Sequence, residues 1–112
     1  MLTIKALSDF GCDIESGIKR CANNEGLYLK LVKTIPSNLG FNNLYEALKN
    51  NNLDDAFSYA HGLKGIVSNL SLDPLLKPIS ELTEHLRNKD NIDYSKYISL
   101  IETKRKELDN LL

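Results

Sequence analysis

One stretch of the sequence, YAHGLKGIVSNL at residues 59–70, decides the fold. Successive residues of an α-helix are rotated by about 100°, so residues three or four apart share a face. With His61 at the centre of one face, the residues within about 60° of it are Asp54, Phe57, Lys64, Gly65 and Ser68. The opposite side is apolar and consists of Leu53, Ala56, Tyr59, Ala60, Leu63, Ile66, Val67 and Leu70. A core histidine would lie within the apolar stripe, so the pattern predicts a helix over residues 53–70 with His61 facing solvent.

Two glycines lie inside this predicted helix, where each costs roughly 1 kcal/mol relative to alanine. Gly62 lies about 100° from His61, and close packing against another helix explains it. Gly65 lies on the polar face beside His61, where packing gives no reason for it. We therefore expect that a partner must approach the imidazole closely. Lys64 places a positive charge beside the ring, which suits a group that acquires phosphoryl oxygens.

The rest of the chain is also predicted to be helical. Asp13 caps a helix that ends near residue 20, a further helix begins near residue 25, and Asp73 caps a helix with Pro74 in its first position. The last helix begins at residue 93 or 94. Pro36 lies within an apolar stripe and disfavours helical backbone before it, so one kinked helix and two helices both remain open.

The predicted architecture is a single all-α domain over residues 1–112. No segment alternates as exposed strands do, and several amphipathic helices joined by short loops form antiparallel bundles. We expect an antiparallel four-helix bundle with additional short N-terminal helices.

Composition excludes several classes of protein. A net charge of −1 argues against a nucleic-acid binder. No apolar run reaches the roughly 20 residues that span a bilayer, and no secretory signal opens the chain. The spacing of Cys12 and Cys21 matches neither a metal site nor a disulfide framework, so both are expected to be reduced thiols in a cytoplasmic protein.

Other reactive groups are sparse. His61 and His85 fall on different helices without the paired spacing of a metal site, so no metal ligands are predicted. The sequence has no nucleophile elbow and no glycine loop between a strand and a helix. The chemistry is therefore expected at His61.

The run His61-Gly62-Leu63-Lys64-Gly65, preceded by Ala60, resembles the His-x-Leu-Lys-Gly signature of histidine-containing phosphotransfer (HPt) domains. Residues 11–20 and 28–32 also resemble the N-terminal part of such domains, and Asn69-Leu70 matches a pair that often follows the signature. The sequence departs from the family at Ile66, Val67, Ser71 and Leu72, and at Pro36 and Pro78.

This resemblance implies a phosphorelay intermediate that is not a turnover enzyme. His61 would be the phosphoryl acceptor and donor, Lys64 would supply charge support, and Gly65 would allow close approach. Phe57, Ser68 and Asp54 would border the partner. The partners would be response-regulator receiver domains and a hybrid sensor histidine kinase, acting on a monomer. The chain has no intrinsic cofactor, and the receiver would bring Mg²⁺. The alternative is a helical adaptor that binds a receiver or kinase through the same face without phosphorylation.

Overall fold

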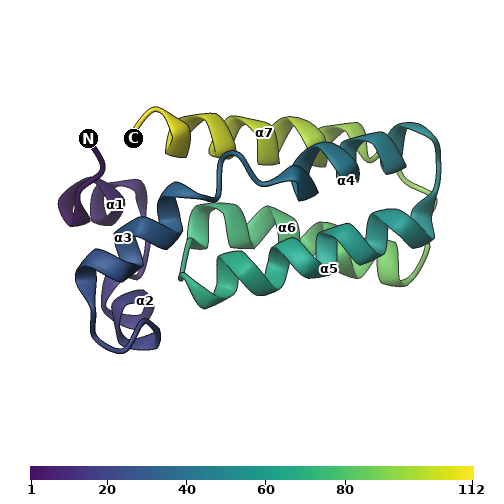
Figure 1. Cartoon of the computed structure of the whole chain (residues 1–112). Coiled ribbons are helices and arrows are strands. Elements are labelled where there is room, and N and C mark those ends of the chain that lie inside the picture. Colours follow the sequence, from purple (N-terminus) through teal and green to yellow (C-terminus); the bar gives the residue numbers. More distant parts are fainter.

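Seven α-helices and no strands make up the chain, and the computed structural model describes all of its residues, 1–112 (Figure 1). The helices are α1 (Ile4–Phe10), α2 (Ile14–Arg20), α3 (Glu25–Lys33), α4 (Leu39–Lys49), α5 (Leu53–Asn69), α6 (Asp73–Arg87) and α7 (Ser95–Asp109). The all-α prediction is confirmed. None of the helices combines the length and the apolar character needed to cross a membrane.

Side-chain caps set the start of the first five helices. In each, an oxygen of the capping side chain accepts a hydrogen bond from a backbone N–H of the first turn. The caps of α1 to α5 are Thr3, Asp13, Asn24, Asn38 and Asn52. The predicted cap of α6 was wrong, because Asp73 is the first helical residue and Leu72 occupies the cap position. Pro74 is consequently the second residue of α6, still within the first turn, where a missing N–H leaves no helical bond unmade.

The segment around Pro36 divides the chain into two helices and so decides between the two sequence-based alternatives. α3 ends at Lys33 and α4 begins at Leu39, with Pro36 buried between them. The carbonyl oxygen of Pro36 accepts a 2.7 Å hydrogen bond from Nε of Arg105 on α7. Proline thus ends one helix, and its carbonyl anchors the connection.

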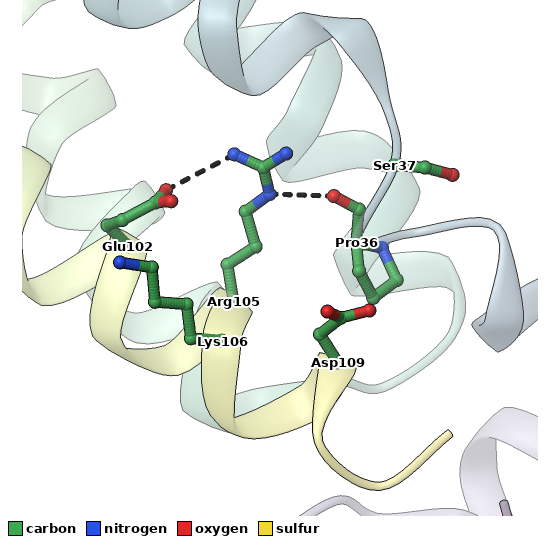
Figure 2. Close-up of a pocket in the computed structure, with 6 residues that line it drawn as sticks. All are labelled: Pro36, Ser37, Glu102, Arg105, Lys106 and Asp109. Atoms are coloured by element: carbon green, nitrogen blue, oxygen red, sulfur yellow. Dashed lines mark hydrogen bonds and ion pairs between the residues drawn. The ribbon is translucent and has the colours of Figure 1, made fainter.

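Arg105 is the centre of a polar cluster that joins α7 to α4 and to the α3–α4 connection. Figure 2 shows its guanidinium between the Pro36 carbonyl and the carboxylate of Glu102. The same guanidinium lies 5.0 Å from the ring centre of Phe41, and Glu102 also accepts a 2.7 Å hydrogen bond from the hydroxyl of Tyr45. The pocket drawn in Figure 2 is lined by residues of α7 and of the α3–α4 connection, and by none of α5.

Packing of α5 against both α4 and α6, and of α6 against α7, forms the main core. The molecule measures 41 × 24 × 20 Å, and its radius of gyration of 14.1 Å is close to the roughly 13 Å of a compact domain of this length. Gly40 permits the close approach of α4, because a Cβ there would lie 3.1 Å from a methyl carbon of Leu63. α5 contributes Ala56, Ala60, Leu63 and Val67 to the core.

The three N-terminal helices lie together at one end of the molecule, beside the turn between α5 and α6 (Figure 1). The hydroxyl of Tyr28 donates a 2.9 Å hydrogen bond to the carbonyl of Leu70. A guanidinium nitrogen of Arg20 donates to the carbonyl of Ser68 at 2.6 Å and to the hydroxyl of Ser71 at 3.1 Å. Tyr28 thus gives the Leu70 carbonyl a donor, and Arg20 adds a second donor to the Ser68 carbonyl, which also accepts from the N–H of Ser71.

Candidate functional site

His61 lies in the middle of α5 on the face that the core leaves free. The buried residues of this helix recur at spacings of four, three and four, which places them on one side. His61 is exposed, as predicted, and neither ring nitrogen takes part in a hydrogen bond or an ion pair within the chain. Its two ring nitrogens are therefore available to a partner.

The cap and the first turn of α5 stabilise the N-terminal end of this helix. The side chain of Asn52 accepts a hydrogen bond from the N–H of Asp55, and Asp54 and Asp55 place negative charge at the positive end of the helix dipole. His61 is far enough from both ends to be held by regular helix on each side. Its position is consequently set by backbone that is helical throughout residues 53–69.

Phe57 lies directly beside His61. The two ring centres are 5.7 Å apart, and the rings are tilted by 40°. The sequence predicted an exposed aromatic residue here, but Phe57 is only half-exposed, because it packs in part against the core. The guanidinium carbon of Arg87 lies 5.1 Å from the centre of its ring. Arg87 is the last residue of α6, so residues of two helices meet at this point.

The residues around Lys64 and Gly65 leave open space beside the imidazole. Lys64 is half-buried, and no carboxylate oxygen lies within 4 Å of its ammonium group. A Cβ built at Gly65 would meet no atom within 4 Å, which agrees with the predicted room for a partner. The same is true of Gly62, so the prediction of close helix packing at Gly62 was wrong. The close approach to α5 occurs instead at Gly40 on α4.

The two outer predicted residues are bound into other parts of the protein. Asp54 lies at the start of α5, where its carboxylate is 3.2 Å from the ammonium group of Lys89. Ser68 is half-buried near the end of α5, and its carbonyl accepts the hydrogen bond from Arg20. The structure thus brings Phe57 to His61 by direct contact, and places Asp54 and Ser68 toward opposite ends of the same helix.

A groove of about 380 Å³ begins at Gly65 and runs between α3 and α5. Its lining residues are Leu31, Thr34, Ile35, Gly65, Ile66, Asn69 and Leu70. The sequence placed Ile66 and Tyr59 in the buried stripe of α5, but they are 40% and 38% exposed. The buried stripe is therefore narrower than predicted, because α4 and α6 cover only its centre, and Ile66 borders the groove instead.

Sequence reasoning missed both Arg87 and this groove. The signal for the groove was present in part, since Ile66 stands where the HPt pattern usually has a small residue. No comparable signal marked Arg87, because the register between α5 and α6 decides which side chain of α6 meets Phe57.

The remaining reactive side chains lie elsewhere. His85, on α6, holds a carboxylate oxygen of Asp90 2.8 Å from its Nδ1, and its ring centre lies 5.6 Å from that of Tyr97. Both cysteines are buried and unpaired. Burial, with a smaller contribution from the charge of Asp73, raises the pKa of the Cys12 thiol to about 12. Cys12 consequently carries no thiolate near neutral pH. No three side chains among His, Cys, Asp and Glu gather as a metal site requires.

The fold and the exposed His61 face define an all-helical protein with one free histidine flanked by an unpaired lysine and open space. Comparisons with protein-family models, with curated proteins and with solved structures find no match to this chain. The likeness to HPt domains therefore rests on the sequence motif around His61.

Proposed function

We propose that this chain is a histidine-containing phosphotransfer protein of a multistep two-component phosphorelay, in which His61 carries a phosphoryl group between receiver-domain aspartates. The observation that carries the proposal is the free, exposed imidazole of His61 beside the unpaired Lys64 and the open space at Gly65. In this proposal α4 to α7 form the antiparallel four-helix bundle of the family, and α1 to α3 are its additional N-terminal helices.

The transfer step needs a nucleophile and a leaving group. The lone pair of a neutral imidazole nitrogen of His61 attacks the phosphorus of an aspartyl phosphate on the receiver. The new N–P bond forms as the P–O bond to the aspartyl carboxylate breaks, and the carboxylate leaves with the electron pair. The other ring nitrogen keeps its proton. The reverse step passes the phosphoryl group to a second receiver, so the chain is an intermediate and not a turnover enzyme.

Lys64 and Gly65 have distinct parts in this step. Because no carboxylate neutralises Lys64, its ammonium group is available to phosphoryl oxygens. The open space over Gly65 admits the loops of the receiver that hold the acceptor aspartate. These receiver loops would also bring Mg²⁺, which would offset negative charge on the phosphoryl group during the transfer.

The groove between α3 and α5 is the surface on which we place the receiver. It begins at Gly65, and its exposed aliphatic side chains Leu31 and Ile66 are the kind that an interface core buries. Phe57 and Ser68 border the contact from α5, and Asp54 lies at its outer edge. A hybrid sensor histidine kinase and a cytoplasmic response regulator are the partners that this role implies, acting on a monomer.

The test is transfer of acid-labile phosphoryl label from a phosphorylated receiver domain. We expect the wild-type chain to take up label and His61→Gln to take up none, with an unchanged circular dichroism spectrum. His85→Gln is the matched control, since His85 is the only other histidine. Label that persists in His61→Gln, or that disappears only in His85→Gln, would overturn the assignment.

The groove also favours one alternative, a helical adaptor that binds a receiver or kinase without phosphorylation. An apolar groove supports binding whether or not the histidine reacts. The two functions differ in whether wild-type His61 takes up label from a phosphorylated form of a receiver that binds the chain. Binding accompanied by no label on wild-type His61 would favour the adaptor, and binding with label favours phosphotransfer.

A further inference from the structure

Arg87 is a charged residue at the proposed phosphoryl site that the motif does not include. It ends α6, and its guanidinium carbon lies 5.1 Å from the centre of the Phe57 ring. The same ring is 5.7 Å from the ring of His61. Arg87 therefore lies next to the only aromatic ring that contacts His61.

The bonds of Arg87 leave its guanidinium available. No hydrogen bond fixes it, and its one ion pair places Nε 3.5 Å from a carboxylate oxygen of Glu84, with both side chains at least half exposed. Exposed pairs of this kind contribute little to stability. Arg105 gives the contrast within this chain, because hydrogen bonds to Pro36, Asn42 and Glu102 hold its guanidinium in place.

A structural role accounts for only part of this arrangement. A cation at the end of α6 is favoured by the helix dipole, and the guanidinium covers part of an aromatic face. The helix dipole does not require the arginine to lie toward α5, and the contact with the Phe57 ring places it there without using its N–H groups. A long side chain in a weak pair beside a reactive histidine can reach a second anion by turning about its own bonds.

We propose that Arg87 is a ligand of the phosphoryl group on His61. The inference rests on the proposed phosphotransfer function. Phe57 precedes His61 by one turn and Lys64 follows it by nearly one turn, so Lys64 and the ring that Arg87 contacts lie on opposite sides of His61 along α5. In the unphosphorylated protein Arg87 rests on Phe57 and pairs with Glu84. When His61 is phosphorylated, the guanidinium turns from Glu84 to the phosphoryl oxygens.

Charge gives the reason for this exchange. A phosphoryl group carries close to two negative charges near neutral pH, whereas Glu84 carries one. Guanidinium binds the oxygens of such a group through two parallel hydrogen bonds, and bonds of this type are among the strongest in proteins. Lys64 alone would leave part of that charge without a partner. A second cation that engages only the phosphorylated form stabilises phosphohistidine relative to the free imidazole.

Small-molecule phosphorylation followed by NMR tests the inference without a receiver. Phosphoramidate transfers its phosphoryl group to histidine as its own P–N bond breaks and ammonia leaves. We expect the ¹⁵N–¹H signal of Arg87 Nε to move when the wild-type protein is phosphorylated. In a ³¹P titration, Arg87→Gln should raise the pH at which phosphohistidine takes up its last phosphoryl proton by about half a unit or more. Arg87→Lys, which keeps a positive charge, should move that pH part of the way back toward the wild-type value.

Lys5→Gln is the control, since it removes one exposed cation from α1 and leaves the His61 face intact. It should leave the ³¹P titration unchanged. A wild-type Nε signal that does not move on phosphorylation would overturn the inference while the phosphotransfer function stands, and so would equal titrations for wild type and a folded Arg87→Gln. If wild-type His61 takes up no phosphoryl group from either phosphoramidate or a phosphorylated receiver, both proposals fail. The wild-type measurement decides the matter even if Arg87→Gln does not fold.

Discussion

The hydroxyl of Tyr28 donates a 2.9 Å hydrogen bond to the carbonyl of Leu70, which joins α3 to the residue that follows α5. Both residues are buried, so water does not replace this bond if it is lost. Burial raises the pKa of the Tyr28 phenol above its usual range, so the hydroxyl stays protonated and remains a donor throughout the neutral range.

Removal of this hydroxyl is expected to weaken the attachment of the N-terminal helices. Tyr28→Phe keeps the ring but leaves the Leu70 carbonyl without its donor, at a cost of about 1–3 kcal/mol in the free energy of unfolding. Urea unfolding followed by circular dichroism measures the loss. Tyr59→Phe, at a tyrosine that forms no hydrogen bond through its hydroxyl, should change stability much less. Equal stabilities for wild type and Tyr28→Phe would show that the bond does not support the fold.

Gly17 allows Tyr28 to reach this position. A Cβ at Gly17 would collide with a ring carbon of Tyr28 and would lie 2.8 Å from the Leu70 carbonyl oxygen. Gly17→Ala is therefore expected to destabilise the protein by about 1–3 kcal/mol, although alanine is the better helix former. The opposite sign is expected for Gly62→Ala, where a Cβ meets open space, with a gain of up to about 1 kcal/mol. Urea midpoints of the two variants that move in the same direction would contradict this account.

The buried thiol of Cys12 makes stability depend on pH in the alkaline range. Its pKa is raised from 9.0 to about 12 in the folded protein, so the unfolded chain loses this proton first. The contribution of the protonated Cys12 thiol to the free energy of unfolding is fully present below pH 9 and is lost as the pH rises toward 12. We expect the free energy of unfolding of the wild type to fall more steeply between pH 9 and 11 than that of Cys12→Ala. Parallel curves would contradict this expectation. The comparison between variants is needed because Tyr28 acts in the same direction.

Much of this architecture followed from periodicity within each segment. The spacing of apolar residues around His61 predicted the helix at residues 53–70 and the exposure of the histidine, since helical geometry fixes faces within one element. The end of that helix also had a sequence signal. Ser71 stands where the HPt pattern often has glycine, and its backbone adopts a left-handed conformation with φ of 53°, which glycine adopts most easily.

Contacts between helices could not be predicted in the same way. Arg87 reaches Phe57 only because α5 and α6 pack in a particular register, and periodicity within either helix does not contain that register. Ile66 was misplaced for a related reason, because the width of a buried stripe depends on how closely the neighbouring helices approach. The two features that extend the site beyond its motif are therefore both products of tertiary packing.

Bulk at Gly65 provides the sharpest prediction for the proposed function. Gly65→Leu should leave the fold intact, since the new side chain enters open space on an exposed helix face. It should nevertheless slow phosphoryl transfer from a receiver by about tenfold or more, because misplacing reacting groups by 1 Å can cost about 100-fold in rate. The transfer rate of Gly65→Ala should fall between those of wild type and Gly65→Leu.

Rapid-quench transfer assays measure these rates, and Ser99→Leu is the control for added bulk on an exposed surface, here on α7. Phosphorylation of Gly65→Leu by phosphoramidate should stay near the wild-type rate, because that donor is small enough to reach His61 beside a leucine. A loss with both donors would point to damage at His61 itself, and normal transfer from the receiver would contradict close approach. Slower transfer from the receiver, with an unchanged rate of phosphorylation by phosphoramidate, is the result that supports a domain docked over Gly65.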